Sequence, residues 1–125
     1  MRFTEHEMTV ALTAAAKQVA ARGRRADPEA AWEKLTRYQR FTLLDGLGSQ
    51  VLPVLVALPD VEVAPGTRPT FTDQQVTEAV ASTLGDLGRL KRTVQLASRV
   101  ALVKTVLQHV PPRRDPDALT VPDHL

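Results

Sequence analysis

The chain has 125 residues, of which 43% are hydrophobic and 24% are charged, and its formal net charge is +2. These values are typical of one soluble globular domain and exclude a wholly disordered chain, which would combine low hydrophobicity with high net charge. The absence of Cys excludes disulfides, thiol nucleophiles and thiolate metal sites. The N-terminal segment lacks the basic and apolar pattern of a secretory signal, and the most apolar stretch, residues 51–58, is far shorter than the about 20 residues that cross a bilayer. We therefore expect a cytoplasmic protein without membrane contact.

The N-terminal quarter of the chain predicts two helices. Thr4 and Glu7 have the spacing of a capping box, in which each side chain bonds the backbone of the other residue at a helix start. A helix over residues 5–22 should follow, because its apolar residues recur at helical spacing. The Asp-Pro-Glu sequence at residues 27–29 is typical of a helix start, so a short second helix should end near residue 35.

A third helix is predicted from residue 37 onwards, because Thr36 and Gln39 repeat the capping-box spacing. Three large side chains near its start are expected to face inward. They are Tyr38, Phe41 and Leu44. Two glycines within residues 45–49 weaken the helix, and Pro53 deletes a backbone hydrogen bond, so we expect a break or kink there.

The middle of the chain contains one apolar run and one loop-like segment. Residues 51–58 are apolar on nearly all sides and are expected to form the central buried segment. Residues 60–71 hold a Pro-Gly turn between short apolar pieces, which permits either a surface loop or a small β-hairpin. Thr72 and Gln75 then repeat the capping spacing and predict a fourth helix through about residue 84.

The longest predicted helix covers residues 87–110. Its second half is apolar on several faces and needs cover on each, whereas its first half carries one narrow apolar stripe. The stripe consists of Leu87, Leu90, Val94, Ala97 and Ala101. The prolines that follow cannot continue a helix. The sequence therefore predicts an all-α fold, a compact bundle of about five helices in one domain over residues 1–110, followed by an extended, Pro-rich and docked C-terminal tail over residues 111–125.

No group of residues predicts catalysis, a cofactor site or a metal site. Glu5, His6 and Glu7 are adjacent on a helix and point about 100° apart, so they cannot converge on one ion. The stretch from Gly46 to Ser49 lacks the lysine and the preceding strand of a phosphate loop. The remaining carboxylates and histidines are scattered, and no triad or carboxylate pair can be assigned. We therefore assign no catalytic, cofactor-binding or metal-binding residues and expect no enzymatic activity.

The first functional hypothesis is a non-enzymatic helical protein-interaction module that self-associates, as a homodimer, or binds another protein. Two segments, 51–58 and 100–110, are apolar on nearly all sides, and a chain of this size is not expected to cover both alone. The residues predicted at such an interface are Leu102, Val103, Val106, Leu119 and Val121.

The alternative hypothesis is a nucleic-acid-associated regulatory protein. Residues 87–110 hold five basic residues and no acidic one. Four polar side chains share an arc of this helix, opposite the apolar stripe, and such an arc suits phosphate contacts. They are Arg89, Arg92, Gln95 and Arg99. The simpler interpretation is a solvated face whose charges meet Glu78, Asp86 or carboxylates of a neighbouring helix.

Overall fold

The computed structural model describes residues 1–22 and 27–113. These residues form helices and no strand, which confirms the all-α prediction for this part of the chain. The helices are α1 (Glu5–Ala21), α2 (Pro28–Glu33), α3 (Arg37–Ala57), α4 (Asp73–Thr83) and α5 (Arg89–Gln108). Residues 60–71 form a loop, so of the two structures expected there the hairpin is not found. Most of the predicted tail, residues 114–125, lies outside the described residues.

Threonine side chains start three of the helices, as the sequence predicts. Thr4, Thr36 and Thr72 each accept a hydrogen bond of 3.1 Å from the backbone N–H three residues further on. The Glu or Gln at that position accepts the N–H of the capping threonine in return. Each box thereby satisfies two N–H groups that a helix start otherwise leaves without a partner. α2 begins instead with Pro28 in its first turn, where the missing N–H of proline costs nothing.

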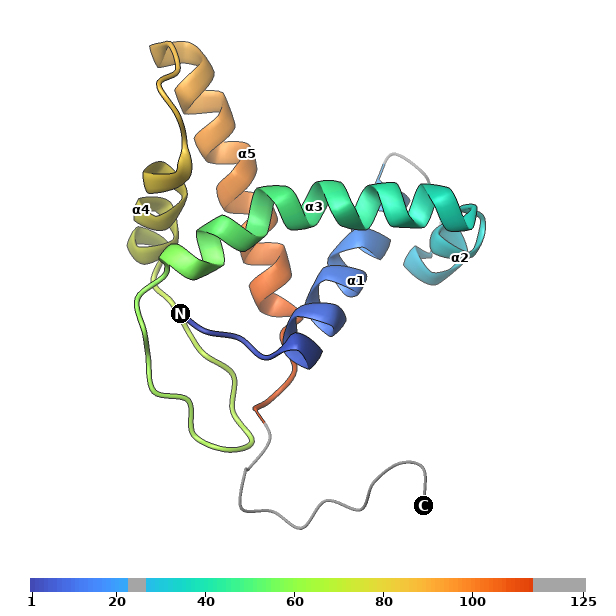
Figure 1. The fold of residues 1–125 in the computed structure, drawn as a ribbon. Helices are drawn as coiled ribbons and strands as arrows, with labels where there is room; N and C mark the ends of the chain where they lie inside the picture. The colour runs from blue at the N-terminus through green and yellow to red at the C-terminus, as the bar shows by residue number, and fades with distance from the viewer. Residues whose placement is uncertain (23–26, 114–125) are drawn as a thin grey trace.

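The core lies where α3 crosses the bundle (Figure 1). α1, α3, α4 and α5 all contribute to one cluster of buried apolar side chains. α1 contributes alanines, whose small side chains allow its close approach to the other helices. The largest side chains with at most 2% exposure are Leu55, Val51, Val54, Val76, Val80, Val103, Val106 and Val110. The predicted central segment is therefore buried on one side, but Leu52 and Val56 within it remain 42% and 75% exposed.

α3 is continuous from Arg37 to Ala57, so of the break or kink expected at the glycines and at Pro53 the break is not found. Pro53 lies on the exposed side of the helix, where water can reach the carbonyl group that its ring leaves unbonded. On the other side, Val51 and Val54 are fully buried. Packing of that buried face therefore holds the helix through the proline.

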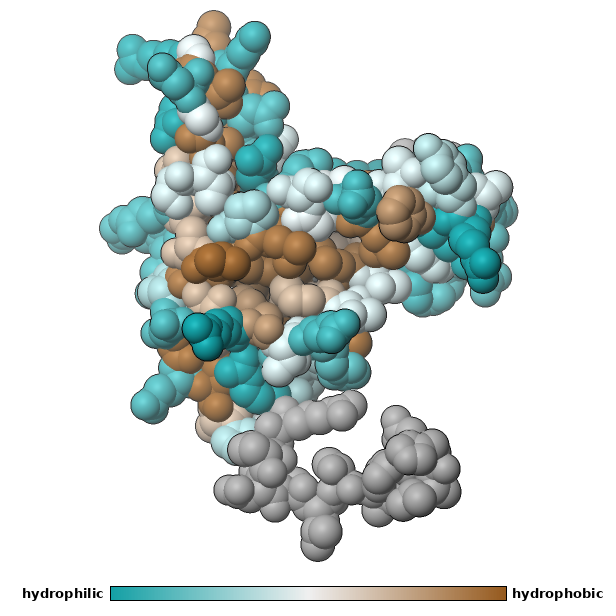
Figure 2. Space-filling view, viewed as in Figure 1, coloured by the Kyte–Doolittle hydropathy of each residue, from teal (hydrophilic) through white to brown (hydrophobic). Residues whose placement is uncertain are grey.

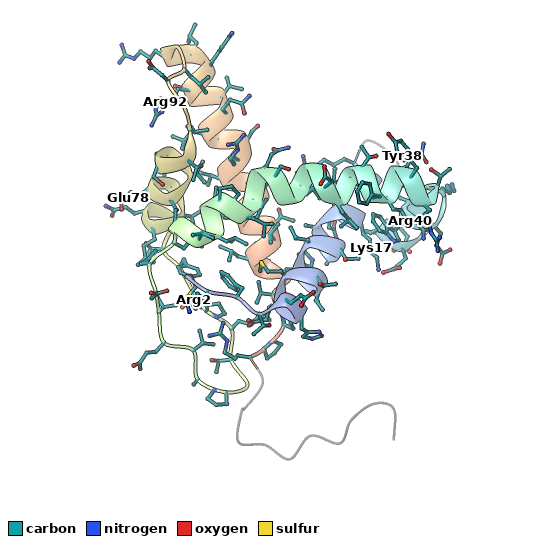
Figure 3. All side chains as sticks on the ribbon, viewed as in Figure 1. Arg2, Lys17, Tyr38, Arg40, Glu78 and Arg92 are labelled. Atoms are coloured by element: carbon teal, nitrogen blue, oxygen red, sulfur yellow. The ribbon has the colours of Figure 1, made fainter. Side chains whose placement is uncertain are left out.

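The first turns of α3 differ from the prediction in their rotation. Tyr38 and Phe41, which were expected to face inward, are 76% and 66% exposed. At 100° per residue they lie about 140° and 80° around the helix axis from the buried Val51, so both lie outside the face that packs on the core. Arg40 occupies the inward position, where its Nε donates a 3.0 Å hydrogen bond to the Trp32 carbonyl of α2 (Figure 3). Its guanidinium also lies 5.4 Å from the centre of the Trp32 ring, a cation–π distance.

Arg113 joins three separate segments at the end of the described chain. Its backbone N–H donates to the Thr67 carbonyl and its own carbonyl accepts the Gly66 N–H, both at 2.7 Å. Gly66 has a φ of 81°, which favours glycine because side chains with a Cβ rarely adopt it. The Arg113 guanidinium lies 3.1 Å from the Glu7 carboxylate of α1 and donates to the Arg2 carbonyl at 3.2 Å.

Glu7 is the one charged side chain that is buried among the described residues, at 3% exposure. Burial raises the pKa of its carboxyl group. Hydrogen bonds from the Thr4 backbone, the Arg113 guanidinium and the Thr4 hydroxyl, together with the Arg113 charge, lower this pKa by more than burial raises it. The net pKa lies below the usual value. Glu7 is therefore ionised at neutral pH, and its charge is compensated inside the fold.

Candidate interaction surface on the last helix

α5 turns its wider apolar face to the core. Val103 and Val106 are fully buried and Leu102 is 9% exposed. Leu96 and Val100 continue the same face toward the start of the helix and pack against the core cluster. Three of the residues predicted at a partner interface thus lie inside the protein itself, and an apolar surface for a partner has to come from elsewhere. The other two, Leu119 and Val121, lie outside the described residues.

The narrow apolar stripe of α5 faces solvent. Leu90 is 84% exposed, Val94 is 66% exposed and Leu87 is 38% exposed. Ala97 and Ala101, which complete the stripe, are exposed as well. An apolar stripe usually marks the buried side of a helix. On α5 two apolar faces point in nearly opposite directions, and only the wider one can contact the core.

The stripe is presented on a projecting arm. The first half of α5 extends beyond α3, and the connection from α4 runs alongside it (Figure 1). Arg92 attaches this arm to α4, because its guanidinium donates to the carbonyls of Ala81 at 3.2 Å and Gly85 at 3.4 Å (Figure 3). Further along, Lys104 pairs with Asp73 of α4 at 2.8 Å. These contacts orient α5 so that the stripe points away from α4.

In this orientation of α5, only part of the predicted basic arc is exposed to solvent. Arg89 and Gln95 are exposed, whereas Arg92 and Arg99 are half-buried. The guanidinium of Arg92 is occupied by backbone carbonyls, and the buried Nε of Arg99 has no hydrogen-bond partner among the described residues. Two of the four side chains are thus free to meet phosphates without rearrangement, and the arc as a phosphate-binding surface stays a prediction.

Histidines and carboxylates do not gather into a metal site in the part of the chain that the structure describes. No group of three or more potential ligands occurs within residues 1–22 and 27–113. His6 is exposed, and His109 lies at the end of α5 with Nδ1 2.8 Å from the Thr105 carbonyl. None of the described helices is long and apolar enough to cross a membrane.

The spacing of the exposed stripe was visible in the sequence, but its exposure was not. Residues 87, 90, 94, 97 and 101 alternate steps of three and four, the spacing of a two-helix seam. Such a seam can pack inside a bundle or on a partner, and only the structure distinguishes the two. Comparison with known protein families, curated proteins and solved structures found no match to this chain. The surface itself is therefore the basis for any functional conclusion.

Proposed function

We propose that this protein is a non-enzymatic helical protein-interaction module that self-associates through the exposed stripe of α5. The observation that supports the proposal is the exposure of Leu90 and Val94 on consecutive turns of one helix. Fully burying a side chain of this type is worth about 1.5–3 kcal/mol. A partner helix that covers both would therefore supply a large share of the free energy that a specific complex needs.

The shape of the stripe favours a second copy of the same chain as the partner. Its large side chains lie at one end and its two alanines at the other. If two α5 helices pair antiparallel, Leu90 of one copy meets Ala101 of the other, and Val94 meets Ala97. Large residues then face small ones at these four positions, as in well-packed helix pairs. The arrangement has twofold symmetry, which closes the assembly at two copies.

Charge is compatible with this pairing. α5 carries basic and no acidic side chains, so a poor alignment would bring cations together. In the antiparallel arrangement Lys91 of one copy lies nearest to Ser98 of the other, and no two lysines face each other across the seam. A contact through one stripe of one helix involves fewer residues than the about 20–30 a side of a standard interface, so we expect a dissociation constant on the order of 10 μM.

Sedimentation velocity over a concentration series tests the proposal. The wild-type chain is expected to shift from monomer to dimer, and a Leu90→Ser/Val94→Ser variant to stay monomeric. Phe41→Ser is the matched control, because Phe41 is similarly exposed but lies on α3. All three changes are at exposed positions, so circular dichroism should show unchanged helicity. A wild-type chain that remains monomeric, or a double variant that dimerises as the wild type does, would refute self-association through the stripe.

Nucleic acid is the alternative partner, and it is supported by the exposed Arg89 and Gln95 on the same arm. Phosphate contacts weaken steeply with salt, because each neutralised phosphate releases counterions. Binding to duplex DNA that is strong at about 50 mM salt, falls steeply by about 200 mM and is lost in Arg89→Ala would favour this alternative. A cytoplasmic location remains part of both proposals and is tested by fractionating the producing cells.

A further inference from the structure

Two adjoining hollows flank the N-terminal segment. The first lies beside the end of the described chain and is lined by Phe3, His6, Pro112 and Arg113, among others. The second lies between the N-terminal segment and α3 and α1. Arg2 and Phe3 line both hollows. The two hollows therefore adjoin at these residues, and we call them together the Phe3 groove.

The floor of the Phe3 groove is apolar. Leu52 and Val56 of α3 line its second hollow and are 42% and 75% exposed, and Phe3 and Met8 are half-buried there. Figure 2 shows a band of apolar surface that follows α3 across this face of the molecule. Val56 is one of the most exposed large apolar side chains among the described residues. The groove thus offers a sizeable apolar surface for a ligand of matching chemistry.

We propose that residues 114–125 of this chain bind in the Phe3 groove, with Leu119 and Val121 against Leu52 and Val56. The position of Arg113 is the first reason. Arg113 itself lines the groove and is fixed there by its contacts to Glu7, Arg2, Gly66 and Thr67. The described chain therefore ends at the mouth of the groove, next to the first residue of the proposed segment.

Length and spacing are the second reason. Leu119 follows Arg113 by six residues, which span up to about 20 Å when extended. Because the groove starts at Arg113, a segment of this length can extend along it. Leu119 and Val121 are two residues apart and share one side of an extended chain. Pro116 and Pro122 favour extended backbone and disfavour helix on either side of this pair.

Charge is the third reason. The segment contains three aspartates and one arginine. Arg2 is exposed where the two hollows meet, and no ion pair of its side chain occurs within the described residues (Figure 3). The acidic residues of the groove are already compensated, since Glu7 pairs with Arg113 and Asp60 lies 3.5 Å from the Met1 ammonium group. An acidic strand with an apolar centre therefore matches the groove in both respects.

Cysteine cross-linking in the full chain tests the proposal, since the natural sequence has no Cys to interfere. A Val56→Cys/Val121→Cys variant is treated with a short bismaleimide, and intact mass distinguishes links within one chain from links between chains. The matched control is Leu90→Cys/Val121→Cys, because Leu90 is exposed to a similar degree but lies on the stripe of α5. We expect the link within one chain to form at least about tenfold faster in the first variant, because binding raises the local concentration of the two thiols.

Adding Arg2→Glu to the first variant should reduce that rate several-fold toward the control. Equal rates in the two cysteine pairs, or links only between chains, would overturn the proposal. The readout does not depend on the oligomeric state, so it separates this proposal from self-association through α5. A second measurement uses the methyl resonances of Leu52 and Val56, which should shift in Leu119→Asp/Val121→Asp while those of Leu90 do not. No shift at Leu52 and Val56 would overturn it as well.

Discussion

The ion pair between Glu7 and Arg113 gives a sharp test of how the fold is closed. Replacing Arg113 with Met keeps the length and the apolar stem of the side chain but removes its charge and its donors. The backbone hydrogen bonds of Arg113 to Gly66 and Thr67 remain possible. What is lost are the contacts of the guanidinium with the Glu7 carboxylate, at 3.1 and 3.4 Å, and with the Arg2 carbonyl.

The expected cost of Arg113→Met follows from the burial of the two partners. Removing one partner of a fully buried ion pair costs about 3–5 kcal/mol, because the other charge is left uncompensated. Here Glu7 is 4% exposed at its side chain but Arg113 is 27% exposed, so water can partly replace the guanidinium. Glu7 also keeps its 2.8 Å hydrogen bond from the Thr4 N–H. We therefore expect a loss of about 2 kcal/mol in the free energy of unfolding at neutral pH.

The pH dependence identifies the cause of that loss. The pKa of Glu7 in the folded protein lies below its ordinary value of 4.5, so its ionised form contributes stability that is present above that value. The contribution is lost as the pH falls through the lowered pKa of the folded state. Arg113→Met removes much of this difference, so the gap between the wild type and the variant should shrink between about pH 7 and pH 3.

Urea unfolding followed by far-UV circular dichroism measures the free energy at each pH. Arg68→Met is the matched control, because the Arg68 guanidinium donates to the Gln108 carbonyl at 2.8 Å and pairs with no carboxylate among the described residues. Its cost should be small and nearly independent of pH. If Arg113→Met and Arg68→Met show the same cost and the same pH profile, the buried pair does not stabilise the fold as argued.

Two further predictions concern single side chains of the core helices. Pro53→Ala should raise the free energy of unfolding by about 1–2 kcal/mol, because an alanine N–H can bond the Ser49 carbonyl within the continuous α3 and alanine favours helix. A variant less stable than the wild type in thermal unfolding would contradict this. Val103→Ala should lower the free energy of unfolding by about 2 kcal/mol, because Val103 is fully buried and the smaller side chain leaves a cavity. A loss of stability smaller than that of the exposed Val94→Ala control would contradict the place of Val103 in the core.

Helix positions could be predicted from the sequence because their signals are local. The threonine capping boxes mark the starts of α1, α3 and α4 at the residues where the structure has them. Each box needs only four consecutive residues, so its signal is contained in the local sequence. Pro53 shows the limit of local reasoning. Its cost within α3 is real, but the packing of the buried face, formed by residues far apart in sequence, exceeds it.

Which face of each helix is buried could not be predicted, because packing between residues far apart in sequence decides it. α5 carries two apolar faces, and α3 begins with Tyr38 and Phe41 outside the face that Val51 defines. Periodicity shows that a helix has an apolar face, but it does not show which face the other helices cover. Glu7 illustrates a related loss of information. Its role in the capping box follows from Thr4 nearby, whereas its pairing with Arg113 joins residues 106 positions apart.

The first turn of α5 has consequences for how the arm behaves when it is alone. Gly88 precedes the helix without a side-chain cap, and the first turn contains no acidic residue. Basic side chains stand there instead, at the positive end of the helix dipole. These features lower the free energy of local opening, so the amide protons of this turn should exchange with solvent earlier than those around Val103. A partner that covers the arm would then stop it from fraying, and binding and helix order would rise together.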